Sequence, residues 1–507
     1  AITVTATFVV WVRTARIWNK SDAIQVSFPI ALPDEPGERQ WGRDEFAEAL
    51  AIAAPNSGLA GFVQTELSRI GDGNRELTIE LVNDSDPDHA NASAHAKGRF
   101  FECSLTVEGL ATNEYLLEDL PDSFRYDRRV TAWGLNCGIE YVSGLFRTND
   151  LPTFEKHRPV YWTVADPKPD LSFDTLAHDP IPQLSALHDS LVRWGERAWS
   201  VDTIRAGTPS WSEELEREVL AEAATFRAEC DRIRAGINLL LKNEMLARAF
   251  MAMNDAMKFS ANGKYLEWRP FQIGFMLANI RSCVGDDQDI TDIVWFSTGG
   301  GKTETYLGII LTAAFYDRLT GKSTGVTAWS RFPLRLLSLQ QTQRFANALA
   351  GAERVRIALQ IPGDPFSLGF LVGSGATPND VRTKTQWDPD DIGMPDRIRM
   401  LKVCPFCRQD SIRMSFDFGL WQVDHRCTNE NCSWDITKPL PIHVVDTEVW
   451  RVLPTVIVGT LDKAAGISVQ ANMRGMIAEP SGFCPRPGHG HTYATRANRP
   501  HGCLVPD

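Results

Sequence analysis

The chain has 507 residues, more than a single hydrophobic core usually organises, so we expect two to four domains. Hydrophobic residues make up 43% and charged residues 23%, an ordinary globular composition, and no apolar run reaches the roughly 18 residues of a transmembrane helix. The formal net charge of −12 argues at first against a nucleic-acid partner.

The negative charge is concentrated in the N-terminal half. Residues 1–263 hold 26 Lys and Arg against 40 Asp and Glu, a balance of −14, whereas residues 264–507 hold 26 against 24, a balance of +2. The C-terminal half can therefore present a local basic face, which permits a DNA partner without demonstrating one.

The first 150 residues favour strands. Apolar and polar residues alternate from Ile2 to Val10 and again from Phe101 to Glu108, as expected for half-buried strands of an antiparallel sheet. The first stretch lacks a basic region followed by an apolar block, so it is not a signal peptide. We expect a β-rich N-terminal domain.

From about Ile181 the period of the apolar residues changes. Between Leu215 and Leu240 they recur at steps of three, four and seven, which indicates one face of a long helix and favours a helical connector. Beyond residue 264, strands alternate with helices. This pattern predicts an α/β fold with a mostly parallel sheet and helices on its faces.

A glycine-rich turn stands in that α/β part, in the stretch "WFSTGGGKTETYLG". Ile293–Phe296 forms a short apolar strand, Ser297–Gly301 the turn, and a helix follows. Backbone N–H groups of such a turn, with a helix N-terminus behind them, bind phosphate oxygens. Lys302 would reach the β- and γ-phosphates and Thr303 would bind Mg²⁺, so we assign both as catalytic. The predicted cofactor-binding residues of the loop are Ser297, Thr298, Gly299, Gly300, Gly301, Lys302, Thr303 and Glu304.

The strict phosphate-loop pattern fails at Phe296, which stands where the first glycine belongs. The remaining "STGGGKTE" resembles motif I of superfamily 2 helicases, which do not require that glycine. Upstream, "WRPFQIGF" resembles the element of these enzymes that contacts adenine, which implies ATP as the nucleotide and adds Arg269, Phe271 and Gln272 to the cofactor-binding residues. The alternatives are a glycine turn that precedes Lys-Thr by chance, and a capping or packing role for Gln272.

Two further stretches resemble the strand-gripping motifs of the same enzymes. "FPLRLLSLQQTQR" resembles motif Ia and implies DNA-phosphate contacts by Arg335 and Gln340, although Arg335 can equally be a surface cation. "LPTVIVGTLDKAA" resembles motif Ib and implies the same role for Gly459, Thr460 and Lys463. Asp446 is the alternative magnesium carboxylate, but it precedes the Ib-like strand, whereas the acidic motif of these enzymes follows it.

Four cysteines have the spacing of a metal site. Two residues separate the pair in "CPFC" and four separate the pair in "CTNENC", an arrangement suited to tetrahedral Zn²⁺. A redox CxxC is the alternative, but it needs only one pair. The predicted ligands are Cys404, Cys407, Cys427 and Cys432. Together with a nucleotide loop, this spacing favours a reducing, cytoplasmic compartment.

The C-terminal tail holds a second, irregularly spaced set of metal-ligand types. These residues are Cys484, His489, His491, His501 and Cys503. Whether they bind a second metal stays open.

Taken together, these motifs resemble those of superfamily 2 helicases, and most closely the DrmA family, the helicase subunit of DISARM anti-phage systems. The resemblance implies an ATP-dependent DNA helicase or translocase with ATP, Mg²⁺ and Zn²⁺, DNA as substrate, a partner subunit and no membrane association. Neither a DExH box nor a second RecA-like lobe occurs within these residues. The alternative is a nucleotide-responsive binding scaffold without competent ATPase activity.

The expected organisation has five parts. They are a β-rich domain (1–150), a helical connector (151–263), the first part of a RecA-like lobe (264–395), a zinc-ribbon insertion (396–440) and the continuation of the lobe (441–507).

Overall fold

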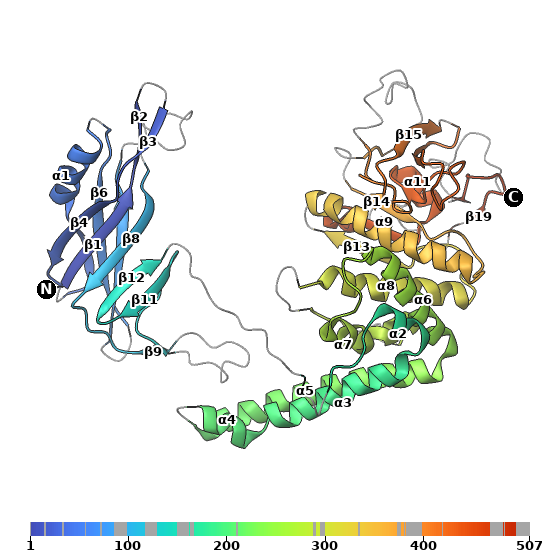
Figure 1. Cartoon of the computed structure of the whole chain (residues 1–507), viewed down its shortest axis with the longest axis horizontal. Coiled ribbons are helices and arrows are strands. Elements are labelled where there is room, and N and C mark those ends of the chain that lie inside the picture. The colour runs from blue at the N-terminus through green and yellow to red at the C-terminus, as the bar shows by residue number, and fades with distance from the viewer. Residues whose placement is uncertain are drawn as a thin grey trace. The chain divides into compact units, whose positions relative to one another are not determined.

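The computed structural model describes residues 2–14, 17–32, 35–55, 57–70, 74–85, 99–116, 129–149, 162, 167–208, 211–286, 290–294, 300–332, 335–372, 377–379, 381, 398–417, 419–466, 480 and 482–492. The chain divides into two compact units, residues 1–160 and residues 161–507 (Figure 1). Among the described helices, none offers the apolar stretch that a bilayer crossing requires.

Among its described residues, unit 1 contains two antiparallel sheets of three or more strands. The larger has the strand order β11-β12-β8-β1-β4, formed by Gly138–Val142, Leu145–Asn149, Phe101–Glu108, Ile2–Val9 and Ile24–Ile30. The smaller has the order β5-β6-β7, formed by Gly37–Trp41, Gly61–Arg69 and Arg75–Asn83. Two short hairpins, β2–β3 (Trp11–Thr14, Ile17–Lys20) and β9–β10 (Tyr115–Leu116, Arg129–Val130), complete the described strands of this unit.

The sequence alternation explains how unit 1 builds its core. On β4, every second residue from Ile24 to Ile30 is buried and the residues between them are exposed. Helix α1 (Arg43–Ala53) places Phe46 against this face, with the rings of Phe8 and Phe46 stacked at 5.6 Å. The prediction of half-buried antiparallel strands is confirmed for β1 and β8, which pair with each other.

Unit 2 begins with helices, four of which share one hydrophobic core with its sheet. These four are α2 (Phe173–His178), α3 (Pro180–Ala198), α5 (Glu213–Lys242) and α6 (Glu244–Ala261), whereas the short α4 (Val201–Gly207) contributes no residue to that core. The next helices are α7 (Pro270–Asn279), the 3₁₀ helix η3 (Ile280–Val284), α8 (Lys302–Leu319) and α9 (Arg335–Ala358). Buried residues of α5 and α6 belong to the same apolar cluster as those of α8, α9 and the strands, so this cluster is continuous from Leu171 to Val458.

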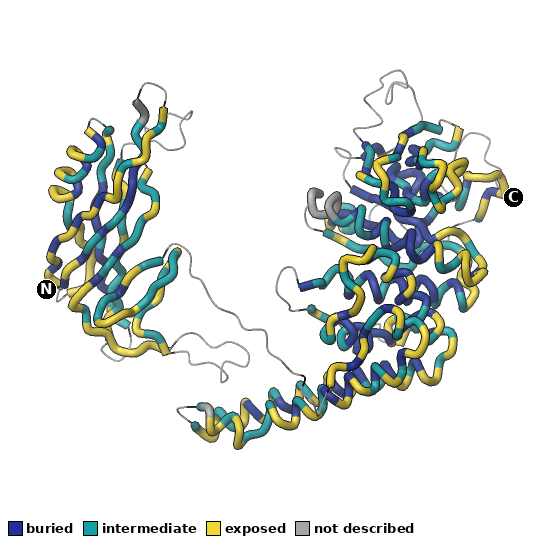
Figure 2. Tube along the Cα trace, viewed as in Figure 1, coloured by how far each residue is buried: buried dark blue, intermediate teal, exposed yellow. Residues whose placement is uncertain are grey.

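The sheet of unit 2 is parallel, as predicted. Its order is β13-β18-β14-β17, formed by Ala328–Phe332, Val456–Thr460, Leu368–Leu371 and Ile442–His443. Every residue of β14 and β18 is buried, as expected for strands covered on both faces (Figure 2). The molecule is therefore a mixed α/β protein.

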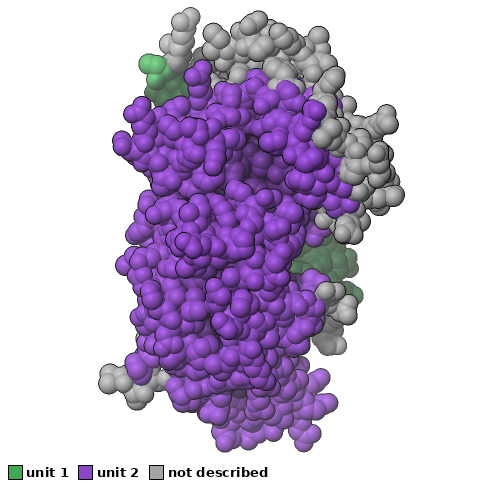
Figure 3. All heavy atoms as spheres, turned by 90° about the vertical axis from the view of Figure 1, so that its right-hand side faces the viewer, with its two compact units in different colours: residues 1–160 green, residues 161–507 purple. Residues whose placement is uncertain are grey.

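The strand order also shows that the chain leaves the parallel sheet and later returns to it. β13 and β14 come early and β17 and β18 come late, yet the four form one sheet. Between them lies the hairpin β15–β16 (Ile412–Asp417, Gln422–Cys427), whose strands pair only with each other among the described residues. After β17 come α11 (Asp446–Val452), β18, α12 (Leu461–Ala465) and the small hairpin β19–β20 (Gly482–Phe483, His491–Thr492). Figure 3 shows one face of unit 2 with its described atoms drawn as purple spheres.

Candidate functional site

The turn that leads into α8 is described only from Gly300 onward, and Ile293 and Val294, the described residues of the predicted strand before it, are irregular. Gly301 caps the helix with φ 98° and ψ 22°, a left-handed conformation that favours glycine. Lys302, Thr303 and Glu304 form the first turn, where N–H groups have no acceptor within the helix. An 18-residue helix therefore presents its positive end at this turn. The predicted loop residues Ser297, Thr298 and Gly299 lie outside the described residues.

The upstream element meets this turn directly. Arg269 Nη1 donates a hydrogen bond to the Gly300 carbonyl at 2.7 Å, and Gln272 Nε2 donates to the Gly301 carbonyl at 2.8 Å. The structure thus brings together Arg269, Gln272 and the two glycines, which sequence reasoning had assigned to one site. Phe271 lies partly buried in the first turn of α7.

The Gln272 amide is engaged at both ends in this structure. Its Oε1 accepts from the Arg269 backbone N–H at 2.8 Å while its Nε2 holds Gly301, and the residue is only 5% exposed. This is a capping box at the start of α7, one of the two interpretations that the sequence left open. Adenine recognition by Gln272 stays a prediction.

Buried packing sets the distance between α7 and the turn. Trp268, 1% exposed, donates from Nε1 to Asn254 Oδ1 of α6 at 2.7 Å and packs edge-on against Phe173. A Cβ at Gly308 of α8 would lie 2.4 Å from Met276 Sδ and 3.3 Å from Trp268 Cη2. Glycine at position 308 therefore lets α8 approach α7 closely, which keeps Arg269 within reach of the loop.

An arginine that sequence reasoning missed lies beside the predicted magnesium ligand. Arg344 of α9 donates from Nη1 to Thr303 Oγ1 at 2.9 Å and forms an ion pair with Glu304. Two tyrosines lie near the Arg344–Glu304 ion pair. Burial raises the pKa of Tyr306. Burial, and to a smaller extent the charge of Glu304, raises the pKa of Tyr265 to about 12. Both phenols are therefore neutral at physiological pH.

The residues predicted to grip DNA are only partly described. Arg335 opens α9 and Gln340 lies in its second turn, but their side chains lie outside the described part of the structure. Gly459 and Thr460 end β18 and are buried. A Cβ at Gly459 would lie 2.6 Å from the Leu371 carbonyl oxygen, so the close approach of β14 requires glycine there.

Lys463 is held by a buried carboxylate. Its Nζ lies 2.5 Å from Asp446 Oδ2, and Asp446 is 1% exposed. Burial raises the pKa of Asp446 to about 6, even though the Lys463 ammonium opposes this shift. Nearby, Glu448 bonds His443 Nδ1 at 2.7 Å. Phosphate binding by Lys463 stays a prediction, because it would compete with Asp446.

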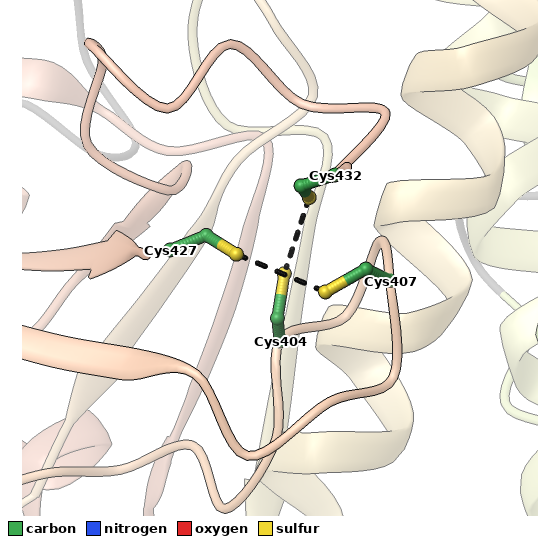
Figure 4. A group of neighbouring side chains, drawn as sticks. All are labelled: Cys404, Cys407, Cys427 and Cys432. Carbon is green, nitrogen blue, oxygen red and sulfur yellow. Dashed lines mark hydrogen bonds between the residues drawn. The ribbon is translucent and has the colours of Figure 1, made fainter. Parts of the chain in front are cut away.

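The four predicted metal ligands lie together around the β15–β16 hairpin (Figure 4). Their Sγ atoms all lie within 4.8 Å of one another, with Cys404–Cys432 and Cys407–Cys427 both at 3.8 Å. Four Zn–S bonds of about 2.3 Å in a tetrahedron place the sulfurs about 3.8 Å apart, so the donor set and its spacing fit zinc.

Local backbone geometry makes this arrangement. In the "CPFC" turn, the Arg408 N–H donates to the Cys404 carbonyl and the Cys404 N–H donates to the Gln409 carbonyl, both at 2.9 Å. Arg408 has a positive φ of 63°, which tightens the turn. Burial raises the pKa of the Cys404 thiol, and a bound cation would favour the thiolate instead.

Helix α9 supports the cluster from the α/β core. Gln343 Oε1 accepts from the backbone N–H groups of Lys402 and Val403 at 2.9 and 3.2 Å, and its Nε2 donates to the Val403 carbonyl at 3.1 Å. Arg408 Nη2 also donates to the Phe259 carbonyl of α6 at 3.2 Å. The segment ahead of Cys404 is therefore fixed to the same helix that carries Arg344.

The tail contributes no second cluster within the described residues. Cys484, His489 and His491 lie on or beside the β19–β20 hairpin, but only the four cysteines form a group close enough for a metal in the part of the chain that the structure describes. His501 and Cys503 lie outside it.

Comparison with known proteins gives one informative relative. No protein-family model matches the chain. The chain is 34% identical over 311 residues to "DISARM protein DrmA" of Bacillus paralicheniformis. The match covers 52% of this chain but only 27% of that relative, so the chain spans about a quarter of the relative's length. The resemblance that the motifs indicated is confirmed over this stretch.

Proposed function

Because the chain is DrmA-like, we propose that it is part of an ATP-dependent DNA helicase or translocase subunit of a DISARM anti-phage system. Its cofactors are ATP, Mg²⁺ and Zn²⁺. Its partners are DNA and another subunit of the defence complex, and it works in the cytoplasm.

One observation carries the nucleotide part of this proposal. Two carbonyls of the glycine turn, those of Gly300 and Gly301, are held by Arg269 and Gln272. With these carbonyls bound on the protein side and a left-handed residue capping α8, the turn is pre-organised for a phosphate. Lys302 and Thr303 then begin the helix at the place where a triphosphate needs a cation and a metal-binding hydroxyl.

The arrangement of the sheet supports a RecA-like lobe with an insertion. β13 and β14 precede the cysteine hairpin and β17 and β18 follow it, yet all four belong to one parallel sheet. We therefore keep residues 264–395 and 441–507 as two parts of one lobe, and residues 396–440 as a zinc ribbon inserted in it. We propose in addition that residues 1–150 form a β-rich domain and that residues 151–263 form a helical connector.

Strand gripping would occur at the carboxyl edge of this parallel sheet. β13 leads toward Arg335 and β18 ends at Thr460, and parallel strands in register bring both ends to the same edge. Contacts there, by Arg335, Gln340, Gly459, Thr460 and Lys463, would hold phosphates without reading bases.

A second candidate is a nucleotide-responsive scaffold without competent ATPase activity. It is favoured by two engaged side chains: Gln272 bonds main chain at both ends, and Lys463 is paired with Asp446. Both groups would have to change partners in a working motor.

DNA-stimulated ATP hydrolysis by the full-length protein separates these candidates. We expect Lys302→Ala to abolish hydrolysis, because the γ-phosphate loses its cation. Lys322→Ala is the matched control: Lys322 follows the other end of α8 and pairs with Asp317, so hydrolysis should persist. Wild-type protein that binds ATP but shows no DNA-stimulated hydrolysis would favour the scaffold.

A further inference from the structure

The inference concerns Arg344, and it rests on the proposed nucleotide site. Arg344 comes from α9, 41 positions after Thr303, and donates to the Thr303 hydroxyl at 2.9 Å. It also binds Glu304, whose side chain is 16% exposed, and donates to Gln341 Oε1 at 3.2 Å. The guanidinium is thus fixed by three acceptors from two helices.

These contacts determine how the Thr303 oxygen can be used. A threonine hydroxyl has one O–H and two lone pairs. In this structure one lone pair of the hydroxyl accepts from Arg344 Nη1. Because that lone pair is taken, a single lone pair remains for a cation. The side chain is then held in one rotamer before any metal arrives.

The charge of Arg344 would oppose a divalent cation at the same oxygen. Glu304 reduces this conflict, because its carboxylate pairs with the guanidinium and the pair carries no net charge. Arginine suits this task better than lysine, because its planar fork can bind a hydroxyl and a carboxylate together.

We propose that Arg344 is a positioning residue that orients the Thr303 hydroxyl for the magnesium ion of a bound nucleotide, while Glu304 neutralises its charge. Arg344 itself touches neither the metal nor the reacting atoms. Arg344 should therefore strengthen nucleotide binding only when Mg²⁺ is present.

The test uses the full-length protein and a non-hydrolysable ATP analogue, with the Kd measured in excess Mg²⁺ and again in EDTA. The ratio of the two values is the magnesium enhancement. Arg344→Ala should lower this ratio roughly tenfold, as loss of a residue that orients a metal ligand commonly does, and leave the Kd in EDTA unchanged. Arg344→Lys should keep part of the magnesium enhancement that Arg344→Ala loses.

A double-variant comparison tests the role of Glu304. Glu304→Gln leaves the guanidinium uncompensated beside the metal site, so the magnesium enhancement should fall further than in Arg344→Ala. Adding Arg344→Ala to Glu304→Gln should then raise the enhancement again, because the repelling charge is gone. A fall that is simply additive would contradict the charge compensation.

Failure of this inference can be told from failure of the nucleotide site. If wild-type binding is abolished by Lys302→Ala, but Arg344→Ala leaves the magnesium enhancement unchanged or increases it, Arg344 does not position Thr303. If wild-type protein shows no magnesium-dependent binding, or Lys302→Ala does not affect it, the nucleotide site itself is wrong.

Discussion

Gln343 and Arg344 are consecutive residues of α9 that hold two different parts of unit 2. Gln343 makes three hydrogen bonds to the backbone of Lys402 and Val403, immediately before Cys404. Arg344 binds Thr303 and Glu304 in the first turn of α8. One short piece of helix therefore contacts both the cysteine cluster and the predicted phosphate loop.

We predict that Gln343→Leu speeds the loss of zinc. The substitution removes three hydrogen bonds that fix the segment ahead of Cys404 and leaves backbone groups unpaired, at a cost of about 1–3 kcal/mol. The rate of zinc transfer to a colorimetric chelator measures the effect. Gln25→Leu, at an exposed position of β4 in unit 1, is the control and should release zinc at the wild-type rate. Equal rates for both variants would contradict a supporting role for Gln343.

We predict that Cys404→Ser removes the metal and destabilises unit 2. Cys404 is fully buried and its Sγ lies 3.8 Å from that of Cys432, so serine would leave a cation with three thiolates. Native mass spectrometry should show about one zinc fewer per chain. The melting temperature should also fall, because the binding free energy of a structural zinc contributes directly to the stability of the folded state.

The control for that experiment is Cys137→Ser, which alters a cysteine of unit 1 outside the cluster. It should change neither zinc content nor melting temperature appreciably. Retention of zinc by Cys404→Ser at the wild-type level would refute the proposed metal site.

We predict that Gly301→Ala disrupts nucleotide binding through a clash with Gln272. Gly301 has φ 98°, and an added Cβ would lie 2.7 Å from Gln272 Nε2, which holds the loop. Gly321→Ala separates strain from the clash: Gly321 has φ 101° just beyond the other end of α8, with no atom within 4 Å of the added Cβ.

Both substitutions should therefore cost about 1–2 kcal/mol of stability from the left-handed backbone. Only Gly301→Ala should weaken binding of the ATP analogue, measured by equilibrium titration. If Gly321→Ala weakens it equally, the effect comes from general strain and not from the loop.

We predict that Asp446 gives unit 2 a stability that declines as pH rises through the mildly acidic range. Burial raises its folded-state pKa to about 6, above the value near 3.9 of an unfolded aspartate. A raised pKa means that the folded state holds the proton more tightly. Its stabilising contribution is therefore complete below about pH 4, is lost between about pH 4 and pH 6, and is absent above that range.

Asp446→Asn should remove this dependence. The free energy of unfolding of the wild type minus that of the variant should fall by up to about 3 kcal/mol between pH 4 and pH 6.5, since each pKa unit corresponds to about 1.4 kcal/mol. Urea unfolding at a series of pH values measures it. A difference that stays constant or grows with pH would show that Lys463, and not burial, controls this carboxyl group.

The sequence predicted the features that depend on local spacing. Cys404 and Cys407 belong to one turn, so their spacing is enough to indicate a pair of metal ligands. In the same way, glycine followed by lysine at positions 301 and 302 indicates the start of α8. The parallel sheet followed from alternating strands and helices. The first two features are set within a few residues of the chain, and the third by the order of neighbouring elements.

Features that depend on tertiary packing escaped prediction. Arg344 reaches Thr303 only because α9 packs on α8, and no local pattern marks one arginine among several on that helix. The place of Lys463 after β18 predicts a contact with phosphate, but the fold brings the carboxylate of Asp446 to it from another element. Likewise, the apolar face of α5 indicated a helix, but it could not show that this helix shares the core of the parallel sheet.

The central claim is that the turn ending at Gly301 binds a magnesium nucleotide. Equilibrium binding of a fluorescent, non-hydrolysable ATP analogue to the full-length protein tests it most directly. We predict saturable binding that Mg²⁺ strengthens, that Lys302→Ala abolishes and that Lys322→Ala leaves intact. Binding that is absent from the wild type, or that survives Lys302→Ala unchanged, would contradict it.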